Sequence, residues 1–293
     1  MNKQKAIILL GGTGFIGSAL AAELVHRGEN VVSISRNLPE KKEEGIEYYA
    51  CDIATQSEKL TEIFGTGNII FLLTGQIYAG FDAEKEKSIF LRVLDTVKAS
   101  FPEKVLFTSS ALVYGDCDAP VNEDYPVGPK EVYSIFKVEC EKMIQDKLAG
   151  IPVGILRLAN VYGSEKNKGF IGLVFKKILD GADMKVNGDG LQERDYIFID
   201  DVVSAMIAVR DGLHDPDIVN VGTGKSLTLL DVIRLVEEAS ERKISYEITG
   251  VPVDEVNISR IDATKLKEKY GFEAKVSLAE GLRKTWDRYN QKD

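Results

Sequence analysis

The sequence predicts an α/β fold, in which a doubly wound parallel sheet carries a smaller C-terminal lobe. Two observations lead to this fold class. Short apolar runs alternate with longer amphipathic runs through the first half of the 293-residue chain. The first apolar run also ends directly in a glycine-rich turn, GGTGFIG, at 11–17. Strands and helices in alternation form a parallel sheet whose two faces are both covered by helices.

The predicted strands of the first half are short runs rich in Val, Ile and aromatic residues, which favour an extended backbone. They are 6–10, 30–35, 46–50, 68–74, 104–110 and 153–158. The segments between them are longer and amphipathic, as expected of helices that cover a sheet. These predicted helices are roughly 15–28, 55–65, 82–100 and 131–149.

The pattern loosens after about residue 160, where short strands and glycine-rich turns such as NGDG at 187–190 separate the predicted helices. The helices expected here are 170–180, 200–212, 228–241, 263–270 and 278–290. We therefore expect residues 1–160 to form one domain and residues 161–293 to form mainly a second lobe, part of which returns to the first domain.

Composition excludes several classes of function. The formal net charge is −9 and the pI is near 5.0, without a basic patch, so neither a nucleic acid nor an anionic membrane is an expected partner. The three cysteines, Cys51, Cys117 and Cys140, are scattered and odd in number, which fits a reducing compartment and offers no metal-ligand spacing. No apolar stretch is long enough to cross a bilayer. We expect a cytoplasmic protein without a metal site.

The glycine-rich turn predicts a dinucleotide site. Residues without a Cβ let backbone N–H groups approach a pyrophosphate, which then lies at the positive end of the following helix. The glycines at 11, 14 and 17 have this spacing, and those at 12, 14 and 17 also satisfy G-x-G-x-x-G. The residues assigned to the cofactor from this turn are Gly11, Thr13, Gly14, Phe15, Ile16 and Gly17.

The end of the second predicted strand bears on which dinucleotide binds. An NAD site usually has an acidic residue there, about 20 residues beyond the glycine turn, to bind the ribose hydroxyls. This chain has Ser35 and Arg36 instead, and a guanidinium binds a 2′-phosphate that a carboxylate would repel. We therefore favour NADP(H), with NAD(H) possible if Arg36 only stacks on the adenine. Asp52 and Ile53, after the third strand, are placed to contact the adenine.

The predicted helix 131–149 contains YSIFK, which puts Tyr133 and Lys137 four positions apart and hence on one helix face. Both head groups can converge on one bound molecule. The alternative is a half-buried tyrosine beside a solvated lysine. Ser110 ends the preceding strand, and the ends of parallel strands open onto the ligand crevice, so we expect it beside Tyr133. Its alternative role is a hydroxyl that caps a turn.

The glycine turn, the serine and the Tyr-x-x-x-Lys pair, in this order, resemble the short-chain dehydrogenase/reductase superfamily. LRLANVYG at 156–163 and NGDGLQERDYIFIDDV at 187–202 resemble its extended branch, the NAD(P)-dependent epimerase/dehydratase family of nucleotide-sugar enzymes. The resemblance implies that Tyr133 is the acid/base and that Lys137 lowers the pKa of the phenol and holds the nicotinamide ribose. It further implies that Ser110 donates a hydrogen bond to the substrate oxygen, and it assigns Leu73, in the LLTG turn at 72–75, to the cofactor site.

The resemblance also implies a substrate site. It puts Asn160 and Arg194 near a nucleotide diphosphate. The alternative for Arg194 is an ion pair with Asp195 or Asp200 that only ties the lobes together. A further implication is a homodimer, formed by pairing of the helices at 82–100 and 131–149. The apolar residues 89, 90, 93 and 94 could equally face their own sheet.

Four departures from the family pattern limit the reaction and the substrate. The family's usual H-L-A-A turn reads LLTG at 72–75. Dehydratases of the family follow the serine with an Asp-Glu pair, but this chain has Ala111 and Leu112, so dehydration is not expected. The position of a second phosphate-binding arginine falls at Pro252 or a neighbour, with Arg260 as the candidate substitute. The family's N-x-x-G-T-x-N pattern has become EKSIFLR at 86–92.

These observations predict an enzyme that epimerises C4 of a nucleotide-linked sugar through a keto intermediate, or reduces a 4-keto sugar. Reduction is favoured by the Arg36 signal, because NADPH is the usual cellular reductant, and epimerisation by the overall family pattern. Two alternatives remain. One is an NADPH-dependent reductase of a small carbonyl compound unrelated to nucleotides, and the other is a non-catalytic dinucleotide sensor, which would be expected to lack the tyrosine or the lysine.

Overall fold

A computed structural model of the chain describes residues 5–74, 81–251 and 256–290. The chain divides into two compact units. Unit 1 consists of Met1–Ser109, Val132–Leu156 and Val209–Val219, and unit 2 of Ser110–Glu131, Arg157–Ala208 and Asn220–Asp293.

This division differs from a single boundary near residue 160. Residues 110–131 belong to unit 2, which is therefore not the smaller of the two. The reason is a set of long-range backbone hydrogen bonds: the N–H of Cys117 donates to the carbonyl of Ile258, and that of Val121 to the carbonyl of Arg260. No local pattern in the sequence reports such contacts. Val209–Val219 is the part of the C-terminal half that belongs to unit 1.

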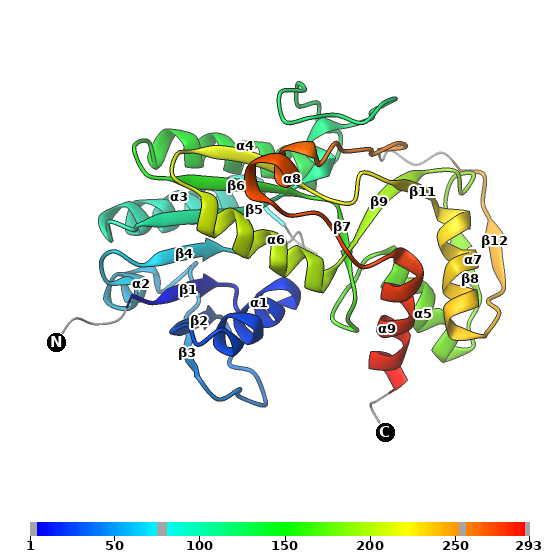
Figure 1. The fold of residues 1–293 in the computed structure, drawn as a ribbon, viewed down its shortest axis with the longest axis horizontal. Coiled ribbons are helices and arrows are strands. Elements are labelled where there is room, and N and C mark those ends of the chain that lie inside the picture. Colours follow the sequence, from blue (N-terminus) through cyan, green and yellow to red (C-terminus); the bar gives the residue numbers. More distant parts are fainter. Residues whose placement is uncertain (1–4, 75–80, 252–255, 291–293) are drawn as a thin grey trace. The chain divides into compact units, whose positions relative to one another are not determined.

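The central sheet has seven strands within the described residues, in the order β10-β6-β5-β4-β1-β2-β3 (Figure 1). Their bounds are β1 Ile7–Leu10, β2 Val31–Ser35, β3 Ile46–Ala50, β4 Ile69–Leu72, β5 Lys104–Ser110, β6 Val153–Leu158 and β10 Asp217–Val221. The sheet is parallel, as predicted, and Ile7 of β1 is in register with Val31 on one side and Ile69 on the other. The strand order reverses at β1, where ligands of doubly wound sheets bind.

Side chains alternate across this sheet with the two-residue period of a strand. Ile8 and Leu10 of β1 belong to a buried core formed with three helices, whereas Ile7 and Leu9 point to the opposite face. The three helices are α2 Ser57–Phe64, α3 Ala83–Ala99 and α4 Val132–Lys147. Phe90, Val93 and Leu94 of α3 lie in that core and therefore face their own sheet. This agrees with the alternative prediction for these apolar residues, which did not need a subunit contact.

Helix α1, Phe15–His26, begins directly behind the glycine turn and packs against β1 and β2. It ends two residues earlier than predicted. Gly28 has a φ of +77°, and its N–H donates to the carbonyl of Val25, so the left-handed glycine terminates the helix.

Unit 2 contains two small sheets. One has the order β11-β9-β7 and the other pairs β12 with β8. The strands are β7 Asn160–Tyr162, β8 Met184–Val186, β9 Glu193–Phe198, β11 Ser226–Thr228 and β12 Tyr246–Ile248. Helices α5 Phe170–Asp180, α7 Leu229–Ser240 and α9 Leu278–Asn290 pack together beside them (Figure 1). Phe175 of α5 stacks on Trp286 of α9 with ring centroids 5.6 Å apart.

The remaining elements are a short 3₁₀ turn at Ala111–Tyr114, α6 at Ile199–Gly212 and α8 at Thr264–Tyr270. The predicted strands and helices all correspond to observed ones, with ends that agree within about two residues. The agreement extends to α5 and α9, whose bounds are those predicted.

Candidate active site

The glycine turn after β1 has a backbone that requires glycine. Gly11 has a φ of +96°, in the left-handed region, and its N–H donates to the carbonyl of Ile34 at 2.8 Å. The N–H of Gly14 donates back to the carbonyl of Gly11 at 3.0 Å. The turn therefore crosses from β1 into α1 within four residues, at the carboxyl edge of the sheet.

The start of α1 can bind an anion. Gly14 is its N-cap and has no side chain to accept the N–H groups of the first turn. Those donors and the helix dipole favour a phosphate at this end. Gly17, in the first turn, lies so close to the loop that an added Cβ would be 2.3 Å from the Gly11 carbonyl oxygen and 2.7 Å from Gly12 Cα. Both neighbours are backbone atoms and cannot rotate away.

We expect Gly17→Ala to weaken dinucleotide binding by about tenfold or more, because the methyl group must push the turn away from the helix end. Fluorescence titration with NADH and with NADPH measures the loss. Gly154→Ala is the matched control in β6, since its added Cβ would have only an ordinary contact, 3.4 Å from Leu213 Cδ2. Equal affinities for Gly17→Ala and the unchanged protein would contradict a phosphate site at this turn.

Ser35 and Leu73 support the turn rather than face away from it. The Ser35 hydroxyl oxygen accepts the N–H of Thr13 at 3.1 Å. The N–H of Leu73 donates to the carbonyl of Leu10 at 2.9 Å, and a Cβ on Gly11 would lie 3.2 Å from the Leu73 carbonyl. These residues therefore lie together at the ends of β1, β2 and β4. The last residue of the LLTG turn, at position 75, lies outside the described residues.

The predicted adenine-side residues have different surroundings. Arg36 is exposed, and within the described part of the chain its guanidinium has no hydrogen bond or ion pair. The carboxylate of Asp52 accepts the N–H of Ala54 at 3.0 Å, and Ile53 is half-buried against the sheet core. Arg36 is thus the one whose charge is available to a ligand.

Tyr133 and Lys137 lie on one face of α4, as their spacing predicts. Lys137 is only 3% exposed, and its Nζ donates to the carbonyls of Thr108 at 2.8 Å and Thr74 at 3.4 Å. The Nζ is 5.7 Å from the centre of the half-buried Tyr133 ring. Burial lowers the pKa of Lys137 to about 8, because desolvation disfavours its charged form. The solvated lysine of the alternative interpretation is therefore wrong.

Ser110 is the last residue of β5 and is 8% exposed. Its hydroxyl oxygen accepts the N–H of Leu112 at 3.2 Å and so caps the short 3₁₀ turn. Capping a turn is the alternative role predicted for Ser110 from the sequence. Accepting that bond leaves the hydroxyl hydrogen as a donor. Ser110 belongs to unit 2, while Tyr133 and Lys137 belong to unit 1.

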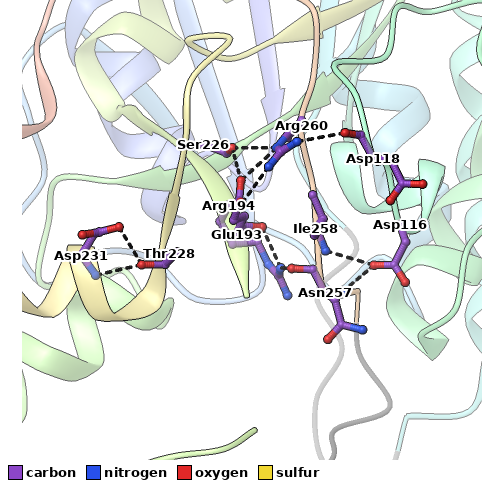
Figure 2. A network of polar contacts seen from close by, with 10 residues as sticks. All are labelled: Asp116, Asp118, Glu193, Arg194, Ser226, Thr228, Asp231, Asn257, Ile258 and Arg260. Carbon is purple, nitrogen blue, oxygen red and sulfur yellow. Dashed lines mark hydrogen bonds and ion pairs between the residues drawn. The ribbon is translucent and has the colours of Figure 1, made fainter. Parts of the chain in front are cut away.

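Asn160 and Arg194 both lie in unit 2. The Asn160 amide donates to the carbonyl of Asp195 at 3.3 Å. The Arg194 guanidinium donates to the backbone carbonyls of Glu193 at 2.9 Å and Asn257 at 3.1 Å (Figure 2). It also donates to the carbonyl of Val256. These acceptors are neutral, so the positive charge of Arg194 is not cancelled by them.

The alternative prediction, an ion pair of Arg194 with Asp195 or Asp200, is wrong. Adjacent strand residues point to opposite faces, and Asp195 accordingly accepts the N–H groups of Thr223 and Gly224, each at 2.9 Å. Burial raises the pKa of Asp195 to about 6, against the opposing effect of these hydrogen bonds. Asp200, on α6, pairs with Arg288 at 3.3 Å.

Arg260, the candidate second phosphate ligand, is held in an ion pair. Its guanidinium binds both carboxylate oxygens of Glu193, at 2.9 and 2.7 Å, and donates to the carbonyl of Asp118 (Figure 2). The carboxylate compensates the charge that a phosphate would need. Arg260 is therefore a poor substitute for the missing arginine. Pro252 lies outside the described residues.

Two carboxylates that were not predicted from the sequence, those of Asp116 and Glu131, hold the segment 256–258. Asp116 accepts the N–H groups of Asn257 and Ile258 (Figure 2). Glu131 accepts that of Val256. Hydrogen bonds to the backbone and to Lys130 lower the pKa of Asp116, although burial opposes them. No local motif marks these residues, because their partners are more than a hundred positions away.

Neither a metal-binding cluster nor a membrane-spanning helix is found in the part of the chain that the structure describes. Across 5–74, 81–251 and 256–290, no cluster of three or more His, Cys, Asp or Glu side chains could hold a metal ion. In the same ranges, no helix combines the length and the apolar character that crossing a membrane requires.

Comparison with known proteins gives a consistent match. Residues 7–222 match the model of the family described as NAD dependent epimerase/dehydratase. A UDP-N-acetyl-α-D-glucosaminuronate decarboxylase of Bacillus cytotoxicus is 30% identical, and the match covers 99% of this chain and 100% of that protein. A dTDP-4-dehydro-6-deoxyglucose reductase of Escherichia coli is 28% identical, with 96% of each chain covered.

The fold matches a solved structure with bound ligands. MoeE5 in complex with UDP-glucuronic acid and NAD superimposes with a TM-score of 0.88 and 25% sequence identity. The match covers 97% of this chain and 99% of that one. The likeness therefore extends over both units.

Proposed function

Because the chain belongs to the NAD dependent epimerase/dehydratase family, we propose that it epimerises a nucleotide-linked sugar or reduces a 4-keto sugar of that kind, with NAD(P)(H) as hydride carrier. The observation that carries the proposal is the buried ammonium group of Lys137 beside Tyr133 on α4. Burying an ammonium group costs desolvation free energy, and a purely structural role beside a phenol does not require that cost.

The roles of the residues follow from their chemistry. The nicotinamide, when bound, accepts or delivers the hydride. Tyr133 takes or gives the proton of the sugar hydroxyl or carbonyl. A free phenol has a pKa of about 10, and bringing such a group near pH 7 needs about 4 kcal/mol of selective stabilisation of the phenolate. The Lys137 charge, in its poorly hydrated surroundings, contributes to that stabilisation, and the Ser110 hydroxyl donates to the substrate oxygen.

Arg194, with Asn160, is the proposed contact for the substrate diphosphate. Its three hydrogen bonds leave two of its five N–H groups for a ligand, and its acceptors are uncharged. Arg260 does not share this role, because Glu193 compensates its charge. The E. coli relative is named for a dTDP-linked 4-keto sugar, and MoeE5 binds UDP-glucuronic acid, which supports a nucleotide-linked substrate here.

The loss of one phosphate contact also favours a second candidate, a reductase of a small carbonyl compound without a nucleotide. That enzyme would use the same tyrosine and lysine but would gain nothing from a diphosphate. A non-catalytic sensor is not supported, since both Tyr133 and Lys137 are present and buried or half-buried.

The two forms of the cofactor have different support. NAD(H) is supported by the family description and by the NAD in the MoeE5 complex. NADP(H), which we favour from the sequence, is supported by Arg36 directly after β2, which is exposed and has no hydrogen-bond or ion-pair partner among the described residues. The glycine turn and the start of α1 serve both forms equally, because both carry the pyrophosphate.

We expect Arg36→Ala to weaken NADPH binding by about tenfold and to leave NADH binding within about twofold, because only the 2′-phosphate forms a charge-assisted pair with the guanidinium. Titrations of both nucleotides against the variant and the unchanged protein measure this. Arg27→Ala, a loss of charge directly after the end of α1 and far along the chain from the glycine turn, is the control. An equal loss for the two nucleotides would show that Arg36 only covers the adenine.

The experiment that tests the function is mass spectrometry of the small molecules retained by the purified protein, followed by assays with the identified sugar. We expect a dinucleotide together with a nucleotide sugar. Interconversion of two epimers without net cofactor consumption identifies an epimerase, and stoichiometric oxidation of NADPH or NADH identifies a reductase. A protein that binds neither dinucleotide would contradict the proposal. Reduction, at the expense of NADPH or NADH, of a carbonyl compound that carries no nucleotide would favour the second candidate.

We further propose a cytoplasmic homodimer. The three cysteines are free and buried, which suits a reducing compartment. Val132 and Ile135 of α4 are 59% and 43% exposed, so this helix has apolar surface for a second copy, as the family resemblance implies. Sedimentation of Ile135→Glu, expected to be monomeric, against the unchanged protein checks the assembly.

A further inference from the structure

We propose that Glu141 is a positioning residue of the site, whose buried carboxylate keeps the Lys137 ammonium group charged and fixes the end of β5 through Ser109. The consequence for catalysis rests on the proposed function. The electrostatic relation between the two side chains does not, and it can be measured by itself.

Glu141 continues the row that Tyr133 and Lys137 begin. The three residues are each four positions apart on α4 and therefore lie on one helix face, one turn above the other. Glu141 is 4% exposed and Lys137 is 3% exposed. An acid and a base thus lie one helical turn apart in surroundings with almost no water.

The carboxylate is held by a neighbouring strand. The hydroxyl of Ser109, itself 3% exposed, donates to Glu141 Oε1 at 2.5 Å. The preceding residue of β5, Thr108, accepts the Lys137 Nζ through its carbonyl at 2.8 Å. Two successive residues of β5 therefore bind two successive turns of α4. The strand then continues into Ser110.

The charge of Lys137 needs such a neighbour. Burial lowers its pKa to about 8, and Cys140 and Glu141 are the groups whose charges act in the opposite direction. Cys140 is a weak contributor, because burial raises the pKa of its thiol to about 12 and the group stays neutral. Among the described residues, the other groups around the Nζ are the carbonyls of Thr108 and Thr74 and the rings of Phe107 and Tyr133, and none of these carries a negative charge while the phenol keeps its proton.

Without the Glu141 carboxylate, the effect of burial on Lys137 would be opposed mainly by its hydrogen bonds to the two backbone carbonyls. The lysine would then lose its proton at a pH closer to neutrality, and a neutral amine cannot stabilise a phenolate. Glu141 therefore acts through Lys137 and needs no contact with the substrate or the cofactor.

The test is the titration of Lys137 in protein labelled with ¹³C at the lysine Cε, with the signal assigned by its absence in Lys137→Met. Glu141→Gln keeps an acceptor for Ser109 but removes the charge, and we expect the Lys137 midpoint to fall by about one pH unit or more. Glu139→Gln is the matched control on the same helix, since Glu139 pairs with Lys87 at 2.7 Å. It should shift the midpoint by less than about 0.3 units. Ser109→Ala, which removes the anchor and keeps the charge, should shift it less than Glu141→Gln does.

An unchanged Lys137 midpoint in folded Glu141→Gln would overturn the proposal. If that variant does not fold, the unchanged protein decides the question through ¹³C labelling of the glutamate carboxyl carbons, with Glu141 assigned in Glu141→Asp. A carboxylate signal at pH 7 supports the proposal, and the signal of a protonated acid at that pH overturns it. Neither measurement depends on turnover, so their outcome is separate from that of the proposed reaction.

Discussion

Tyr133→Phe is expected to lower turnover by about 10³-fold or more while changing dinucleotide affinity by less than about fivefold. General acid–base catalysis contributes about 10² to 10⁴ in rate, and the phenylalanine ring keeps the shape of the side chain but has no proton to transfer. The measurement is single-turnover hydride transfer, followed by nicotinamide absorbance, with the sugar identified by mass spectrometry. Single-turnover conditions are needed because product release can limit the steady-state rate.

Tyr246→Phe is the matched control. It removes the same hydroxyl from a tyrosine that is 41% exposed on β12, in unit 2. Its turnover should stay within about twofold of the unchanged protein. Similar rates for Tyr133→Phe and Tyr246→Phe would remove the acid/base role and leave only a dinucleotide-binding protein.

Asn220→Leu is expected to lower the free energy of unfolding by about 3–5 kcal/mol. Asn220 is fully buried in unit 2, and its amide nitrogen donates to the carbonyls of Val121 and Asp262, both at 3.0 Å. Its amide oxygen accepts the hydroxyl of Tyr114 at 2.7 Å. Leucine has a similar volume but would remove three hydrogen bonds at once from buried or half-buried groups. Each lost partner costs about 1–3 kcal/mol where no other group replaces it, and the Val121 carbonyl still accepts the N–H of Asp262.

Urea denaturation followed by circular dichroism measures this loss. Tyr114→Phe, which removes one of the three bonds from the other side, should cost only about 1 kcal/mol. If the two variants were equally stable, the Asn220 amide would not be the residue that joins residues 110–131 to the segment around 262. The slope of the transition should stay unchanged if the loss acts on the folded state.

The positions of the strands and helices could be predicted from the sequence, because each depends on a local pattern of residues. β1 and β5 are short apolar runs, and α5 and α9 have the bounds that their local pattern predicted. The glycine turn was also predictable, because a positive φ at Gly11 and the close approach of Gly17 to the loop depend on residues within seven positions. Local sterics and side-chain period act over such distances, so the chain itself reports them.

Charges were harder to assign, because their partners come from distant segments. The sequence does not distinguish Arg194 from Arg260. In the structure Arg194 donates to neutral carbonyls, whereas the charge of Arg260 is compensated by Glu193. The Ser110 hydroxyl caps a turn, and its position at the end of a predicted strand could not show whether it has this role.

By itself the sequence determined the parallel α/β sheet, the glycine turn and the shared face of Tyr133 and Lys137, since each follows from spacing along the chain. Only the tertiary structure decided that Lys137 is buried, that Glu141 is held by Ser109 in the row beyond it, and that residues 110–131 join unit 2. The physical reason is that desolvation and the pairing of charges depend on which strand and helix ends are neighbours in space, and that neighbourhood is set by the packing of the whole sheet.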